Sequence, residues 1–119
     1  NLTNIIKDIF NFHDVMPKFT GFAWLKNKKT GGTQEIDIFI PDLKIAIEYD
    51  GEQHFRPVKI WGGEEGLKNV KRRDRRKNRV IKQHPEDITH FIRFNYKEKI
   101  TKEYVVSKLI KKGVLKEQP

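Results

Sequence analysis

The stretch EIDIFIPDLKIAIEYDG, residues 35–51, contains two segments of alternating side chains joined by a short turn. Because a strand directs successive side chains to opposite faces of a sheet, each segment predicts a β-strand with one apolar face. The residues between them, Pro41-Asp42-Leu43, are typical of a turn. The sequence therefore predicts a β-hairpin around which the rest of the chain is organised.

One face of the predicted hairpin is acidic. Ile36, Ile38 and Ile40 share the apolar face of the first strand, and Ile45, Ile47 and Tyr49 share that of the second. The opposite face gathers four carboxylates, from Glu35, Asp37, Glu48 and Asp50. Like charges that face each other across a sheet are destabilising, so we expect a positive partner among them. A divalent cation with oxygen ligands would serve, and a solvated outer face with Lys44 as counter-ion is the alternative.

The end of the second strand carries a motif. Asp50-Gly51 ends the strand, and Glu52-Gln53-His54 follows at once, so carboxylates and an imidazole meet at one strand end. An Asp in a strand, a short turn and an apolar strand that ends in E-x-D-G-x-x-H resemble the PD-(D/E)xK nuclease superfamily. Within it, the pattern is similar to the branch of the very-short-patch repair endonucleases and their homing-endonuclease relatives. The segment IPDLKIAIEYDGEQHF is similar to small endonuclease-like domains of phage and bacterial genomes, and the resemblance covers most of the chain.

The order of expected elements is similar to the core of that superfamily. Spacing predicts a helix over 3–12, a strand over 19–25, the two hairpin strands, a helix over 64–83, a strand over 88–94 and a helix over 101–112. The resemblance implies an α+β (α/β) restriction-endonuclease-like fold, a four-stranded mixed sheet flanked by helices. The length of 119 residues predicts one domain, and a start at Asn1 without Met suggests excision from a longer protein.

The charge balance indicates a polyanionic partner. The chain has 25 Lys and Arg residues against 16 Asp and Glu residues, a formal net charge of +9. The run KNVKRRDRRKNRVIK makes the long helix its most basic element, and RRDRR is similar to the repair endonucleases at the same point in the fold. A solvated helix face would look alike, but we expect contacts with the DNA backbone. The expected contacts are Lys28, Lys29, Lys68, Arg72, Arg73, Arg75, Arg76 and Arg79, and Lys77 is placed on the same outer faces.

The resemblance implies metal-dependent hydrolysis of phosphodiester bonds by a restriction- or homing-type DNA endonuclease. Asp37, Glu48 and Asp50 would bind Mg²⁺ or Mn²⁺, which prefer hard oxygen ligands. His54 would transfer the proton, because its pKa lies near neutrality. The superfamily lysine two residues after the Glu is replaced by Asp50. His54, or Lys68 or Lys71 on the long helix, would supply that function. Additional candidates for the site are Glu35, Glu52, Asp8, Lys71 and Asp74.

Several alternatives stay open at this point. A catalytically silent nucleic-acid-binding domain would keep the basic helix, and RNA remains an alternative to DNA as the partner. Trp61 and Phe55 are expected to cover the hairpin as parts of the core, and projection toward a ligand is the alternative. The absence of cysteine excludes disulfides and cysteine-ligated zinc, and no apolar run approaches the ~18 residues of a membrane span. We expect a protein of the bacterial or phage-infected cytoplasm, as a monomer or homodimer.

Overall fold

Four strands form one mixed sheet in the computed structural model, which describes residues 1–26, 31–32 and 34–117. In the order of the sheet they are β1 (Met16–Phe19), β2 (Ile36–Ile40), β3 (Ile45–Asp50) and β4 (His90–Asn95). β1 pairs with β2 and β2 with β3 in antiparallel fashion, whereas β3 and β4 are parallel. Three helices complete the chain: α1 (Leu2–Ile9), α2 (Gly63–Lys82) and α3 (Lys102–Lys111). The predicted α+β order of helix, three strands, helix, strand and helix is confirmed.

Each face of the sheet has its own hydrophobic core. The larger core lies under α1 and α3, and it contains Leu2, Ile6, Phe10, Ile38, Ile40, Ile45, Ile47, Ile92, Phe94, Val105 and Leu109. The smaller core lies on the side of α2 and contains Leu25, Ile36, Phe39, Ala46, Ile81 and Ile88. Alternation along β2 and β3 supplies side chains to both cores, as it predicts for a sheet covered on both faces. Ile36, predicted to share a face with Ile38, belongs instead to the α2 side.

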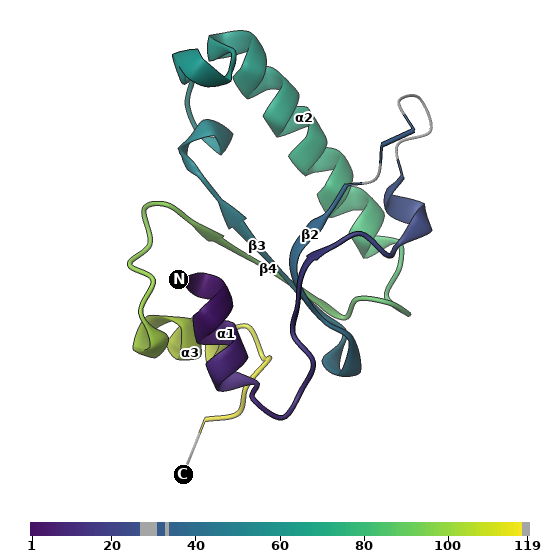
Figure 1. Ribbon diagram of the computed structural model, residues 1–119, viewed down its shortest axis with the longest axis vertical. Helices are drawn as coiled ribbons and strands as arrows, with labels where there is room; N and C mark the ends of the chain where they lie inside the picture. The colour runs from purple at the N-terminus through teal and green to yellow at the C-terminus, as the bar shows by residue number, and fades with distance from the viewer. Residues whose placement is uncertain (27–30, 33, 118–119) are drawn as a thin grey trace.

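α2 covers the sheet only with its C-terminal turns. Ile81 is packed in the smaller core, and the helix also contacts the short 3₁₀ helices η3 (Glu52–His54), through Asp74, and η4 (Lys59–Trp61). In Figure 1 the helix rises away from the crossing strands, and the N-terminal end of α2 stands far from α1 and α3. This overhang positions polar residues of α2 opposite the end of the hairpin.

The chain between residues 16 and 25 differs from the prediction. The strand lies earlier, at Met16–Phe19, and Ala23–Leu25 form a 3₁₀ helix, η1. Trp24 stacks on Phe22 at 4.6 Å and on His84 at 4.2 Å between ring centroids, and its indole N–H donates to Asp87 Oδ2 at 2.9 Å. These interactions hold Trp24 against the end of α2. An extended strand over the same residues would place Trp24 beyond the reach of these partners. The expected helix over 3–12 likewise ends sooner, at Ile9.

Candidate functional site

The open end of the β2–β3 hairpin is closed by two carboxylates. The paired positions of the ladder are Ile40 with Ile45, Phe39 with Ala46 and Ile38 with Ile47. Beyond them, the Asp37 amide donates to Glu48 Oε2 at 2.7 Å, and the Tyr49 amide donates to Asp37 Oδ2 at 2.8 Å. Side-chain oxygens thus replace the carbonyls of the facing strand, and they fix Asp37 and Glu48 beside each other.

Glu48 forms a buried ion pair with Lys77 of α2. The two residues are 4 % and 8 % exposed, and Lys77 Nζ donates to Glu48 Oε1 and, at 2.5 Å, to the carbonyl oxygen of Glu35. Burial raises the pKa of the Glu48 carboxyl to about 7, whereas Lys77 acts in the opposite direction and Asp37 adds to the increase. Removing a charge from water is costly unless it is paired, so Lys77 and Glu48 depend on each other.

A second polar cluster connects η3, α2 and β4. His54 Nδ1 lies 2.7 Å from Asp74 Oδ2 and 3.7 Å from Asp50 Oδ1. Arg93 donates to Asp50 Oδ1 at 2.7 Å, lies 3.9 Å from Asp74 Oδ1, and donates to the side-chain oxygen of Asn78 at 2.9 and 3.1 Å. The hydrogen bond that His54 Nδ1 donates to Asp74 raises the pKa of His54 above its ordinary value, against the opposing effect of burial. The imidazole is therefore oriented through Nδ1, which leaves Nε2 for other partners.

Both clusters line one pocket of about 1030 Å³ between the hairpin end and the overhanging part of α2. The sheet contributes Asp37, Glu48 and Asp50, η3 contributes His54, and α2 contributes Arg73, Asp74 and Lys77. Carboxylates, an imidazole and cations thus converge on one concave surface. Convergent polar groups in a pocket are the usual form of a binding or active site.

The structure separates the predicted carboxylates into two groups. Asp37 and Glu48 bond to one another's strands, whereas Asp50 faces Arg93 and His54. In the described part of the chain, three or more potential metal-ligating side chains meet at Asp50, His54 and Asp74, and at His84, Glu86 and Asp87. Asp74, one of the additional candidates for the site, lies 3.9 Å from Arg93 and accepts a hydrogen bond from His54.

Four of the additional candidates lie outside the cluster. Asp8 forms an exposed ion pair with Lys102 at 2.6 Å, and Glu52 pairs with Arg56 at 2.6 Å. The side chain of Glu35 is exposed, and its backbone carbonyl oxygen contacts the site by accepting a hydrogen bond from Lys77. Lys68 and Lys71, the expected substitutes for the superfamily lysine, are exposed, and neither lines the pocket.

Lys77 is the site residue that sequence reasoning misplaces. Its position in the most basic run of the chain predicts a place on the outer faces of α2. Its spacing from Asp74 and Ile81 is the available signal to the contrary, since residues three and four apart share a helix face. A lysine three residues after an inward Asp and four before a buried Ile faces the sheet. It is the buried cation that pairs with Glu48.

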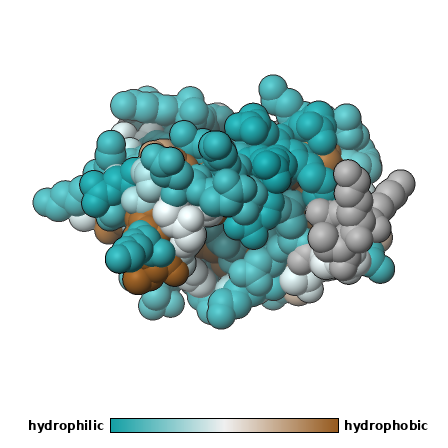
Figure 2. Space-filling model, turned by 90° about the horizontal axis from the view of Figure 1, so that it is seen from above, coloured by the Kyte–Doolittle hydropathy of each residue, from teal (hydrophilic) through white to brown (hydrophobic). Residues whose placement is uncertain are grey.

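The prediction that Trp61 and Phe55 belong to the core is wrong. Trp61 is 52 % exposed and lines the rim of the pocket, and Phe55 is 44 % exposed with its ring 5.7 Å from that of Tyr96. η4 lies at the far end of α2, beyond both cores, so no apolar layer is available to cover it. Figure 2 views this end of the molecule, where hydrophilic surface predominates and hydrophobic surface gathers toward one side.

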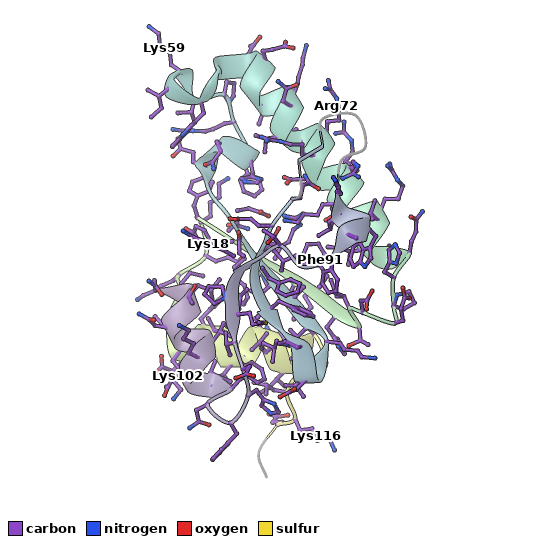
Figure 3. All side chains as sticks on the ribbon, turned by 45° about the vertical axis from the view of Figure 1, so that its right-hand side comes forward. Lys18, Lys59, Arg72, Phe91, Lys102 and Lys116 are labelled. Atoms are coloured by element: carbon purple, nitrogen blue, oxygen red, sulfur yellow. The ribbon has the colours of Figure 1, made fainter. Side chains whose placement is uncertain are left out.

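Among the exposed cations of α2, Arg73 lines the pocket, whereas Lys68, Arg72, Arg75 and Arg79 lie outside its lining. Lys68, Arg72, Arg73, Arg75 and Arg79 are exposed, whereas Arg76 is half-buried and donates to Gln34 and to the carbonyl of Lys26. Figure 3 shows Arg72 on the upper part of α2, away from the sheet. Lys28 and Lys29 lie outside the described residues. None of the described helices is long and apolar enough to cross a membrane.

Comparison with known proteins gives one distant relative. A 50-residue stretch is 40 % identical to "Uncharacterized protein 094L" of Frog virus 3 (isolate Goorha). The match covers 40 % of this chain and 32 % of that protein, so the chain spans about a third of its relative's length. No family model matches the chain, and no solved structure matches it.

Proposed function

We propose that this protein is a metal-dependent DNA endonuclease of the PD-(D/E)xK type. The observation that carries the proposal is the pocket in which Asp37, Glu48 and Lys77 lie beside the His54–Asp74 pair, with Arg73 of α2 in its wall. Paired carboxylates, a cation and an oriented imidazole are the groups that phosphodiester hydrolysis needs. The exposed arginines and lysines elsewhere on α2 suit a polyanionic substrate.

The donor set of Asp37 and Glu48 fits a divalent cation. Both side chains line the pocket. Among the described residues, Asp37 Oδ2 accepts from the Tyr49 amide, which leaves Oδ1, whereas Glu48 Oε1 and Oε2 each accept one hydrogen bond, from Lys77 and from the Asp37 amide. A Glu48 oxygen would bind the cation through its second lone pair. Burial raises the pKa of Glu48 most, and proximity to Asp37 adds to the increase; a cation between the two carboxylates would reduce their mutual repulsion. Asp37 and Glu48 would hold Mg²⁺ or Mn²⁺, with Asp50 as a further candidate ligand. A bound ion would polarise the phosphate and lower the pKa of a water molecule.

His54 is assigned the proton transfer. Its Nδ1 is engaged by Asp74, so Nε2 is the atom that accepts or gives the proton. Asp74 fixes the orientation of the ring, and Arg93 holds Asp50 next to it. Lys77 keeps Glu48 oriented and balances its charge, the function that the sequence suggests for Lys68 or Lys71. The exposed cations of α2 would bind the phosphates on either side of the cut.

A catalytically silent nucleic-acid-binding domain is the second candidate. The observation that favours it is that Lys77 and Arg93 already neutralise Glu48 and Asp50, so two of the three site carboxylates have a cationic partner without an added metal ion. Such a domain would bind nucleic acid through α2 and would cleave nothing.

The test is an incubation of the protein with plasmid DNA, duplex and single-stranded oligonucleotides, and RNA, with Mg²⁺, Mn²⁺ or a chelator. The proposal expects cleavage of DNA that requires the metal and stops with the chelator. Binding without cleavage under every condition would favour the silent domain. Cleavage of RNA alone would keep the reaction and change the substrate.

A further inference from the structure

A second hollow, of about 550 Å³, meets the first at the hairpin end. Glu35, Asp37 and Tyr49 line both hollows, so Asp37 stands between them. The second hollow lies on the α1 side of the sheet, where Leu2, Pro17, Lys18 and Ile100 complete its wall. Its volume suits a small organic ligand, and its wall is more apolar than that of the first.

Tyr49 presents its ring to this second hollow. Alternation along β3 places it on the same face as the buried Ile47 and opposite to Glu48 and Asp50. Ile47 is fully buried in the larger core, whereas Tyr49 is 42 % exposed because it lies beyond the edge of that core. The exposed aromatic ring, on the face opposite to Glu48 and Asp50, is a surface on which a nucleobase can stack.

Lys18 supplies a positive charge on the same wall. Pairing of Pro17 with Ile38 and of Phe19 with Ile36 puts Lys18 opposite Asp37. Its φ of 50° is left-handed, a conformation that is unfavourable for lysine and that concentrates at functional sites. Within the part of the chain that the structure describes, its ammonium has no hydrogen-bond or ion-pair partner. Figure 3 shows it at the waist of the molecule, between α1 and the overhanging α2.

We propose that the second hollow binds the nucleotide that adjoins the scissile phosphate, with its base on Tyr49 and a phosphate near Lys18. The proposal rests on the proposed nuclease function, since it assigns the second hollow to the same substrate strand. The two hollows lie on opposite faces of the sheet. A DNA strand that occupies both hollows must therefore be unpaired from its complementary strand at the cleavage point. The substrate class is therefore DNA with unpaired nucleotides at the cleavage point, such as a flap or a frayed end.

The test compares variants in two assays, each with a matched control. The first measures fluorescence anisotropy of a labelled five-nucleotide thymidine oligonucleotide in the presence of a chelator. The second measures Mg²⁺-dependent cleavage of a flap substrate and of the fully paired duplex of the same sequence. The variants are Tyr49→Ala, Tyr49→Phe and Lys18→Asn. The controls are Tyr104→Ala, an exposed tyrosine on α3, and Lys44→Asn, the other lysine with a left-handed backbone, at the opposite end of the hairpin.

Tyr49→Ala should weaken oligonucleotide binding about 5- to 100-fold, the range of base–aromatic stacking, and Tyr49→Phe should restore it. Lys18→Asn should also weaken binding without lowering the melting temperature, because Asn tolerates the left-handed backbone. Wild-type protein should cleave the flap faster than the duplex, and Tyr49→Ala should lose that preference.

Two negative outcomes separate the proposals. If the wild type cleaves DNA but Tyr49→Ala and Lys18→Asn bind and cleave like their controls, the second hollow is not a nucleotide site, and the nuclease function stands. If the wild type neither binds nor cleaves DNA, both proposals are overturned together. Equal cleavage of flap and duplex by the wild type would overturn the assigned substrate class.

Discussion

At the scale of single residues, the charge on Glu48 is set by two opposing effects. Burial raises its pKa from 4.5 to about 7, and Lys77 limits the increase. The folded chain therefore holds this proton more tightly than the unfolded chain. The stabilisation from this group is complete below pH 4.5 and is lost as the pH rises through about 7.

Glu48→Gln should remove that pH dependence from the metal-free protein. The wild type should lose on the order of 3 kcal/mol of unfolding free energy through this group between pH 5 and pH 8. The variant should show a correspondingly smaller decrease. Urea unfolding at several pH values in a chelator measures both, and Glu103→Gln, an exposed acid on α3, is the control. The same decrease in Glu48→Gln and wild type would show that the group does not titrate as described.

Lys77→Met should leave Glu48 as a buried carboxyl without its cation. Breaking a buried pair by removing one partner costs about 3–5 kcal/mol, and the loss should be larger at pH 8 than at pH 5, where Glu48 is protonated. Lys71→Met, an exposed lysine on the same helix, should change the unfolding free energy by less than about 0.5 kcal/mol. Equal stability of the two variants in urea would contradict the buried pair.

Alternation along the hairpin is sufficient to identify Asp37, Glu48 and Asp50 as residues at one strand end. Alternation cannot show that Glu48 and Asp50 belong to separate clusters, because their partners are Lys77 of α2 and Arg93 of β4, which are distant in sequence. Such partners are fixed by tertiary packing and carry little local signal.

At the scale of elements, α2 combines a packing role with a binding role. Its C-terminal turns anchor it through Ile81, and its remaining length presents cations to solvent. The sequence predicts this helix nearly to its ends. The sequence misplaces β1, because the aromatic run of residues 19–25 is typical of a strand. In the structure Trp24 stacks on His84, and this tertiary contact has no signal in the local sequence.

Charge removal on α2 should change the salt dependence of DNA binding. Replacing Lys68, Arg72 and Arg75 together by alanine should weaken binding and reduce the slope of log affinity against log salt by up to ~3, about 0.9 for each phosphate that is no longer neutralised. The control replaces Lys97, Lys111 and Lys112, which are exposed elsewhere. Fluorescence anisotropy from low to high salt measures both triple variants. Identical slopes would remove α2 from the interface.

At the scale of the whole molecule, two cores on opposite faces of the sheet leave the hairpin end uncovered. The composition predicts a basic body around an acidic centre, and the structure gives that centre two hollows joined at Asp37. The hollows could not be predicted, because they follow from how far α2 overhangs the sheet and from where α1 and α3 stop covering it.

The most direct test of the account is the cleavage of plasmid DNA by wild-type protein and by Asp37→Asn, at concentrations where both saturate the DNA. The account predicts that the wild type cleaves with Mg²⁺ or Mn²⁺ and not with a chelator. Asp37→Asn should bind as tightly or more tightly, because a negative charge beside the phosphate is removed, and should cleave no faster than the chelator background. Full activity of Asp37→Asn, or cleavage by the wild type without metal, would contradict the account.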